Sequence, residues 1–199
     1  MLRIVSRPAM TWKERLRHYE KTTCFPRHLF QCPSGQVVGT MVMGNNYQVK
    51  SSYYGGYPHG FLHRMASLFP DRNRVLHVFS GKVDLEAMPG DTVDLNEDMQ
   101  PTYVSNAQTM EGVPLALYDL VLCDPPYSVE DAEHYKTTMV KRNVVLRSLA
   151  GGLKSGARVV WLDQVLPMYR KQDYTVEALI GMVKSTNHRF RVVTVFKRR

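Results

Sequence analysis

The chain has 199 residues and a formal net charge of +8, with 26 Lys and Arg against 18 Asp and Glu. A chain of this length can bury a full hydrophobic core without disulfides or a metal ion to hold it together. Its cysteines, Cys24, Cys32 and Cys123, are odd in number and unevenly spaced, and no signal-peptide pattern precedes them. No apolar run approaches the roughly 18 residues of a membrane-spanning helix. These features exclude disulfide-rich and membrane-spanning classes, and we expect a cytoplasmic protein.

The excess positive charge is concentrated near the two ends of the chain. Basic residues there include Arg3, Arg7, Lys13, Arg15, Arg17, Lys21 and Arg27 at the start, and Arg189, Arg191, Lys197, Arg198 and Arg199 at the finish. Such clustering favours a polyanionic partner such as nucleic acid. The alternative is a solvated surface that keeps the protein soluble.

The first third of the chain is rich in turn-forming residues. It predicts a helix over Thr11–Glu20, a hairpin from His28 to Met43 that turns at Pro33-Ser34-Gly35, and a helix between Pro58 and Pro70. We therefore divide the chain into an N-terminal helix and hairpin extension, residues 1–45, and a main domain, residues 46–199.

From residue 74 onward, short apolar strands alternate with other segments. The predicted strands are Arg74–Phe79, Asp91–Leu95, Thr102–Val104, Tyr118–Cys123 and Arg158–Leu162. They are apolar on both faces, which is typical of strands covered by helices on two sides. A helix is expected over Ser128–Leu149, closed by Gly151-Gly152, and a hairpin over Ile180–Lys184 and Phe190–Phe196. The predicted fold is α/β, a doubly wound and mainly parallel sheet with a C-terminal antiparallel hairpin.

The most informative segment is Asp124-Pro125-Pro126-Tyr127, which directly follows the strand that ends at Cys123. In open α/β sheets, ligands bind beyond the carboxyl ends of the strands. Prolines stiffen this loop, because each fixes its own backbone and restricts the residue before it. The Asp124 carboxylate and the Pro125 carbonyl are two acceptors suited to the N–H bonds of an amino group, and Tyr127 offers a flat face for stacking a base. The alternative is an ordinary turn after a buried strand.

This segment resembles the catalytic loop of class I amino-group methyltransferases that act on adenine N6 in DNA, in a compact form like those of phages and mobile elements. The resemblance runs from about Lys50 to the C-terminus and implies a Rossmann-like methyltransferase fold that uses S-adenosylmethionine. In this chemistry the lone pair of an aromatic amine is delocalised into its ring. Acceptors on both N–H bonds draw the nitrogen toward a tetrahedral shape and free that lone pair. The resemblance therefore implies Asp124, Pro125, Pro126 and Tyr127 as catalytic residues.

The resemblance also implies a cofactor site on the preceding strands. Phe79-Ser80-Gly81 resembles the turn that wraps the methionine part of the cofactor, although Lys82 and Val83 stand where a second glycine is common. Asp94 matches the carboxylate that holds the ribose hydroxyls, and Asn106 matches the residue that binds the adenine amino group. Asp124 is expected to border the cofactor too.

Upstream, the segment Lys50–Pro58 resembles the one that cradles the cofactor's carboxylate, and we expect Lys50, Tyr54 and Gly55 to contribute. A tyrosine-rich turn under the core is the alternative.

The substrate is less sharply defined than the chemistry. Only residues 82–123 separate Gly81 from Asp124, which leaves no room for an inserted domain that reads sequence. DNA adenine is the predicted target, with an RNA base, adenine N6 or guanine N2, as the alternative. A third possibility is a nucleic-acid-binding protein that retains the fold without catalysis.

Three further features of the sequence are weaker indications of a functional site. His18, Cys24, His28 and Cys32 are zinc-ligand types, but they lack the paired Cys spacing, so no metal is predicted. Asp163 follows a strand and is expected to be a surface turn residue rather than part of a substrate cleft. The basic segments 135–138 and 141–143 fit either a phosphate contact or a solvated helix face.

Overall fold

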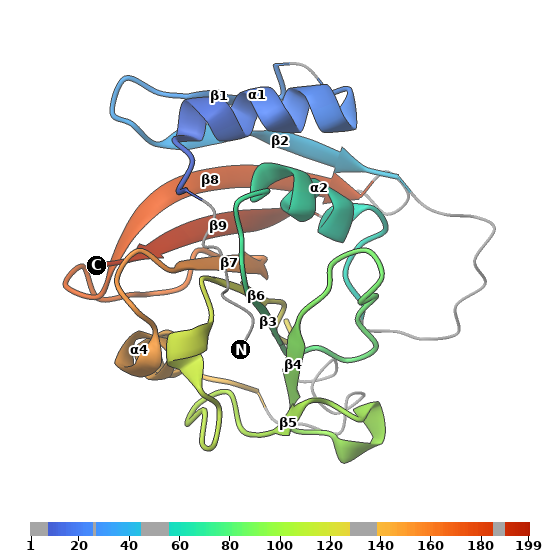
Figure 1. The fold of residues 1–199 in the computed structure, drawn as a ribbon, viewed down its shortest axis with the longest axis vertical. Coiled ribbons are helices and arrows are strands. Elements are labelled where there is room, and N and C mark those ends of the chain that lie inside the picture. The colour runs from blue at the N-terminus through green and yellow to red at the C-terminus, as the bar shows by residue number, and fades with distance from the viewer. Residues whose placement is uncertain (1–7, 26, 45–55, 128–138, 185–189) are drawn as a thin grey trace.

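The computed structural model describes residues 8–25, 27–44, 56–127, 139–184 and 190–199 of the chain. These residues form a nine-stranded sheet in the order β1-β2-β8-β9-β7-β6-β3-β4-β5 (Figure 1). The strands are β1 (Leu29–Gln31), β2 (Val37–Met43), β3 (Val75–Val78), β4 (Asp91–Asp94), β5 (Tyr103–Val104), β6 (Leu120–Cys123), β7 (Arg158–Asp163), β8 (Tyr174–Lys184) and β9 (Phe190–Arg198). The helices are α1 (Trp12–Thr23), α2 (Phe61–Leu68) and α4 (Arg142–Gly152), with short 3-10 turns η1 (Glu97–Met99) and η2 (Leu115–Leu117).

The predicted fold class is confirmed by the strand pairing. Strands β5, β4, β3, β6 and β7 pair in parallel, and β9 inserts antiparallel between β7 and β8. Strand β8 begins at Tyr174, six residues before the predicted start at Ile180. The pairing of β8 with β9 shifts register between Val176 and Ala178, although buried residues alternate along β8 from Tyr174 to Met182.

Helices cover both faces of the central sheet. In β6, Leu120 and Leu122 pack into the core beneath α1 and α2, whereas Val121 and Cys123 pack on the opposite side with α4. All four side chains are buried, because neighbouring residues of a strand point to opposite faces. This two-sided burial explains why the central strands read as continuous apolar runs.

The N-terminal helix and hairpin are also confirmed. Thr11 and Glu14 form a capping box that starts α1, and the guanidinium of Arg15, 1% exposed, pairs with Asp71 at 2.5 Å. Strand β2 pairs in parallel with β8, so the hairpin continues the sheet beyond the C-terminal strands, with α1 lying across it (Figure 1). The division of the chain at residue 45 stays a prediction.

The helix expected over Ser128–Leu149 is confirmed from Arg142 onward and is wrong over residues 139–141. Residues 128–138 lie outside the described part of the chain, and Val140 is not helical. Lys141 takes an extended conformation, and its N–H bonds the side chain of Gln108 at 3.0 Å, so α4 begins only at Arg142.

The helix ends at the expected Gly151-Gly152 pair, and both glycines belong to its last turn. A Cβ on Gly152 would lie 2.7 Å from Cβ of Leu115, so this glycine lets α4 pack closely on η2. No helix among the described residues is both long and apolar enough to cross a membrane.

Candidate functional site

Four neighbouring parallel strands end at one edge of the sheet, in the order β4, β3, β6 and β7. Asp94 is the last residue of β4, Ser80 follows β3, Asp124 follows β6 and Asp163 is the last residue of β7. Polar residues that are far apart in sequence are thus gathered at the edge where doubly wound sheets bind ligands. We call this the strand-end edge.

The Asp124–Tyr127 loop is packed into this edge. Pro125 and Pro126 are buried, while Asp124 and Tyr127 are partly exposed. The Tyr127 hydroxyl donates a hydrogen bond to Oδ1 of Asp124. Burial, and then the charge of Asp124, raise the pKa of Tyr127 well above its ordinary value, so its hydroxyl stays protonated as a donor. The carboxylate and the aromatic ring predicted to meet a substrate are therefore held together.

A residue that sequence reasoning did not place in the site covers the Tyr127 ring. The guanidinium carbon of Arg191 lies 4.5 Å from the ring centroid. Arg191 is in β9, whose register pairs Val192 with Asp163, so the start of this strand lies at the strand-end edge. In the sequence Arg191 was noted only as one of the basic residues near the C-terminus. Because β9 is antiparallel to β7, its first residues lie beside the last residues of β7. The predicted antiparallel direction of this strand is the signal from which the position of Arg191 could have been inferred.

The turn after β3 has the geometry of a tight ligand-binding loop. Phe79 has φ 60° and Gly81 has φ 48°, both in the left-handed region. The Gly81 N–H donates to Oδ2 of Asp94 at 2.8 Å, and the Asn96 N–H donates to Oδ1 at 2.9 Å. Left-handed backbone is costly for a residue with a side chain such as Phe79, and such strain is concentrated at functional sites. Asp94 fixes this turn, and a carboxylate with about four acceptor positions can still receive further hydroxyl donors.

Two of the buried polar atoms without a hydrogen-bond partner among the described residues are Oγ of Ser80, in this turn, and the hydroxyl of Tyr57, whose ring contacts His77 in β3. Tyr57 stacks on Phe61 with ring centroids 5.4 Å apart, and its pKa is raised well above the ordinary value by burial and then by the charge of Asp124. A buried polar atom without a partner costs about 1–3 kcal/mol. These atoms, together with the Asp94 carboxylate, fit a polar ligand such as the predicted S-adenosylmethionine.

The other predicted cofactor residues are either exposed or outside the described part of the chain. Asn106 is exposed after β5, and its side-chain oxygen accepts the N–H of Gln108 at 2.9 Å. Lys50, Tyr54 and Gly55 lie outside the described residues. Their roles stay predictions.

Asp163 is not the surface residue that the sequence predicted. Its side chain is 0% exposed and accepts from Nε and Nη2 of Arg142 at 2.6 and 3.1 Å. The Trp161 indole and the Gln164 N–H add bonds of 3.0 and 2.7 Å. The expectation failed because a single Asp after a strand does not reveal a partner 21 residues earlier. The guanidinium of Arg142 is engaged in this pair rather than forming a solvated helix face.

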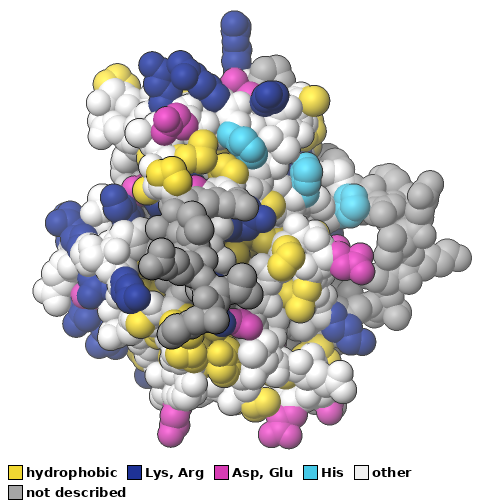
Figure 2. Space-filling view, in the orientation of Figure 1, with side chains coloured by type: hydrophobic (Ala, Val, Ile, Leu, Met, Phe, Trp, Pro, Cys, Tyr) yellow, Lys and Arg dark blue, Asp and Glu magenta, His cyan; other side chains and the backbone are white. Residues whose placement is uncertain are grey.

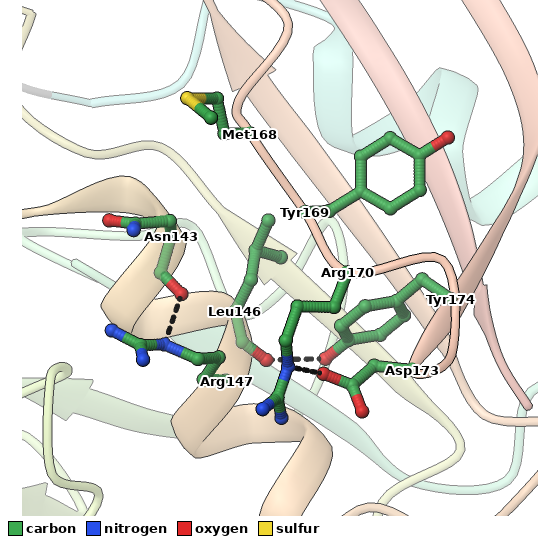
Figure 3. Close-up of a pocket in the computed structure, with 8 residues that line it drawn as sticks. All are labelled: Asn143, Leu146, Arg147, Met168, Tyr169, Arg170, Asp173 and Tyr174. Carbon is green, nitrogen blue, oxygen red and sulfur yellow. Dashed lines mark hydrogen bonds and ion pairs between the residues drawn. The ribbon is translucent and has the colours of Figure 1, made fainter.

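A separate pocket of about 150 Å³ lies between α4 and the segment that links β7 to β8 (Figure 3). Leu146, Arg147 and Tyr169 are among the residues that line it, and none of the sequence-predicted catalytic or cofactor residues does. At its floor the Tyr174 hydroxyl donates to the Leu146 carbonyl at 2.8 Å.

The Cys and His residues of the N-terminal region do not gather in the described part of the chain. Nδ1 of His18 lies 2.8 Å from the carbonyl oxygen of Ser67, and Cys24 is an exposed free thiol. Within the described ranges, no group of three or more His, Cys, Asp or Glu side chains is arranged to hold a metal ion.

No protein-family model matches the chain, and no curated protein matches it. Among solved structures, it is similar to TrmN from Thermus thermophilus, with 16% identity and a TM-score of 0.46 over 63% of this chain and 44% of that one. It is also similar to SMU.1697c, a candidate methyltransferase from Streptococcus mutans in complex with SAH, with 13% identity and a TM-score of 0.37 over 63% of this chain and 86% of that one. The matched part thus spans less than half of TrmN. Similarities this low carry no weight for the chemistry of the present chain.

Proposed function

We propose that this protein transfers a methyl group from S-adenosylmethionine to an exocyclic amino group of a nucleobase, with adenine N6 in DNA as the target. The observation that carries the proposal is the position of Asp124-Pro125-Pro126-Tyr127 at the end of β6, beside the turn that Asp94 fixes after β3. An amine-binding loop and a polar ligand-binding turn on adjacent strands are the two parts that this reaction needs.

Within this proposal, each side chain has a defined task. Asp124 and the Pro125 carbonyl accept the two N–H bonds of the target amine, which frees the nitrogen lone pair. The cofactor supplies a methyl group bound to a positively charged sulfur. Asp94, Ser80 and the Gly81 turn are the residues proposed to hold it, and Tyr57 borders the space next to Asp124. The proton that the nitrogen releases passes to Asp124 or to solvent.

The charge distribution supports a polyanionic substrate. The chain has a net charge of +8, and Lys and Arg are frequent on the upper and left parts of the face shown in Figure 2, where α1, α4 and the C-terminal strands lie. An amino group inside a stacked duplex is out of reach, so the proposed DNA substrate requires extrusion of the target base.

RNA is the second candidate substrate because of the spacing between the cofactor turn and the catalytic loop. Only residues 82–123 separate Gly81 from Asp124, too few for an inserted domain that reads a DNA sequence. An unpaired RNA base would need no such domain and less energy for extrusion.

Isotope transfer tests the proposal and separates the two substrates. The protein is incubated with S-adenosylmethionine that carries a tritiated methyl group and with either genomic DNA or ribosomal RNA, and each product is digested to nucleosides. We expect the label in N6-methyladenine from DNA. Label in RNA nucleosides alone would contradict the DNA target, and no label in either would contradict methyl transfer to nucleic acid.

A further inference from the structure

Arg191 and Tyr127 form a cation–π pair at the strand-end edge. The guanidinium carbon lies 4.5 Å from the ring centroid, so this flat cation rests on the face of the ring. The Tyr127 hydroxyl is bonded to Asp124, which places the ring beside the predicted amine acceptor. A base that stacks on this face of Tyr127 and a guanidinium on the same face exclude each other.

The energies of the two contacts allow one to replace the other. A cation over an aromatic ring contributes about 0.5–2 kcal/mol, and a base stacked on an aromatic side chain contributes about 1–3 kcal/mol. Arg191 is partly exposed and is one residue from the start of β9, so its long side chain can leave the ring without disturbing the core. Exchange is therefore feasible at little cost.

A displaced guanidinium is free to pair with an anion. Asp163, in register with the neighbouring Val192, already accepts four hydrogen bonds from Arg142, Trp161 and Gln164. Four bonds use the ordinary acceptor capacity of a carboxylate. Asp124 is bonded to Tyr127 and is the proposed acceptor of the target amine. A nucleic acid brings an anion of its own, because each nucleotide carries a phosphate that suits the forked geometry of Arg.

We infer that Arg191 is a substrate-binding residue whose guanidinium exchanges partners, leaving the face of Tyr127 to the extruded target base and pairing with a phosphate of the bound strand. This inference rests on the proposed function, since it requires a base to enter the site. An ordinary phosphate contact forms whether or not a target base is present. The phosphate contact assigned to Arg191 forms only when a base has displaced its guanidinium from Tyr127.

The test compares the salt dependence of binding for two DNA duplexes. One contains the adenine that the wild-type protein methylates, and the other has an abasic site at that nucleotide. On the first duplex, Arg191→Gln is expected to reduce the slope of log affinity against log salt by about 0.9, the effect of one lost phosphate contact. On the abasic duplex, no base displaces the guanidinium, so wild type and Arg191→Gln are expected to have the same slope.

Two further variants separate charge from structure. Lys197→Gln removes an exposed charge near the opposite end of the same strand, and its effect on the slope is expected to be the same on both duplexes. Arg191→Lys keeps the charge and is expected to retain the wild-type slope on the adenine duplex. Melting curves check that each variant is folded.

The outcomes distinguish this inference from the proposed function. An unchanged slope for Arg191→Gln on the adenine duplex, with methylation by the wild type intact, overturns the phosphate contact. An equal loss of slope on both duplexes overturns the exchange. A wild-type protein that transfers no methyl group to any nucleic acid contradicts the proposed function, and the inference falls with it.

Discussion

Tyr127 brings two different groups to the strand-end edge, an aromatic ring and a hydroxyl. If the ring stacks on the target base, Tyr127→Phe is expected to keep most of the activity, because the face survives and the Asp124 oxygen released from the hydroxyl remains available to the amine. Tyr127→Ala is expected to lose about 1–3 kcal/mol of transition-state stabilisation, measured through kcat/KM.

Substrates of different pairing state provide the control for Tyr127→Ala. A mismatched base costs less to extrude than a paired one, so the alanine variant should be impaired less on mismatched DNA than on perfect duplex. A phenylalanine variant as inactive as the alanine variant would show that the hydroxyl, and not the ring, carries the function.

His77 links stability to pH. It is fully buried in β3, its Nε2 lies 3.0 Å from the Met88 carbonyl oxygen, and burial lowers its pKa from about 6.5 to about 4. Between these two values the unfolded chain binds a proton that the folded protein does not. The contribution of His77 to stability is therefore complete above pH 6.5 and declines as the pH falls toward 4, by about 3 kcal/mol in all.

Urea unfolding at a series of pH values measures this contribution. His77→Gln is expected to flatten the fall in the free energy of unfolding between pH 6.5 and 4. Identical pH profiles for wild type and His77→Gln would refute the assignment.

At the scale of elements, the β1–β2 hairpin depends on a close backbone approach at Gly39. A Cβ at this position would lie 2.1 Å from the carbonyl oxygen of His28, which is fixed because it accepts the N–H of Thr40 at 3.0 Å. Gly39→Ala is expected to lower the free energy of unfolding by about 3 kcal/mol through this clash. Gly151→Ala in α4 meets nothing within 4 Å and should stabilise the protein slightly. Equal effects of the two substitutions in denaturant titrations would contradict this view.

The Arg142–Asp163 ion pair links the start of α4 to the end of β7. Asp163→Ala would leave the guanidinium of Arg142 and the indole N–H of Trp161 without their acceptor, and the expected loss is about 3–5 kcal/mol. The matched control is Arg74→Met, which breaks the more exposed pair with Asp91 and should cost at most about 1 kcal/mol. Thermal unfolding of the two variants measures both losses of stability. A loss for Asp163→Ala as small as that for Arg74→Met would show that the Arg142–Asp163 pair does not stabilise the start of α4.

Prediction from sequence succeeded where local pattern decides the structure. Strands such as β6 are apolar because both faces are covered, and the Thr11 capping box marks the start of α1. Prediction failed where distant contacts decide it. The start of α4 depends on a bond between Lys141 and Gln108, and the burial of Asp163 depends on Arg142. Arg191 was not assigned to the site, because only the pairing of β9 with β7 brings it there.

At the scale of the whole molecule, the order of the strands determines what can react. The parallel strands β4, β3, β6 and β7 all end at the strand-end edge, and β9 begins there because it runs in the opposite direction. The β1–β2 hairpin extends the sheet beyond β8, on the side away from β4 and β5, and α1 lies next to this hairpin. One edge of a single sheet thus carries the proposed amine acceptor, the proposed cofactor turn and the cation that we assign to phosphate.

The most direct test of methyl transfer by this edge is to measure cofactor binding and methylation in the same Asp124→Ala protein. Because Asp124 is assigned to the substrate amine, we predict that calorimetry shows nearly wild-type affinity for S-adenosylmethionine while incorporation of the labelled methyl group into DNA adenine is abolished. Methylation by Asp124→Ala at the wild-type rate, or loss of cofactor binding together with activity, would contradict the role proposed for this loop.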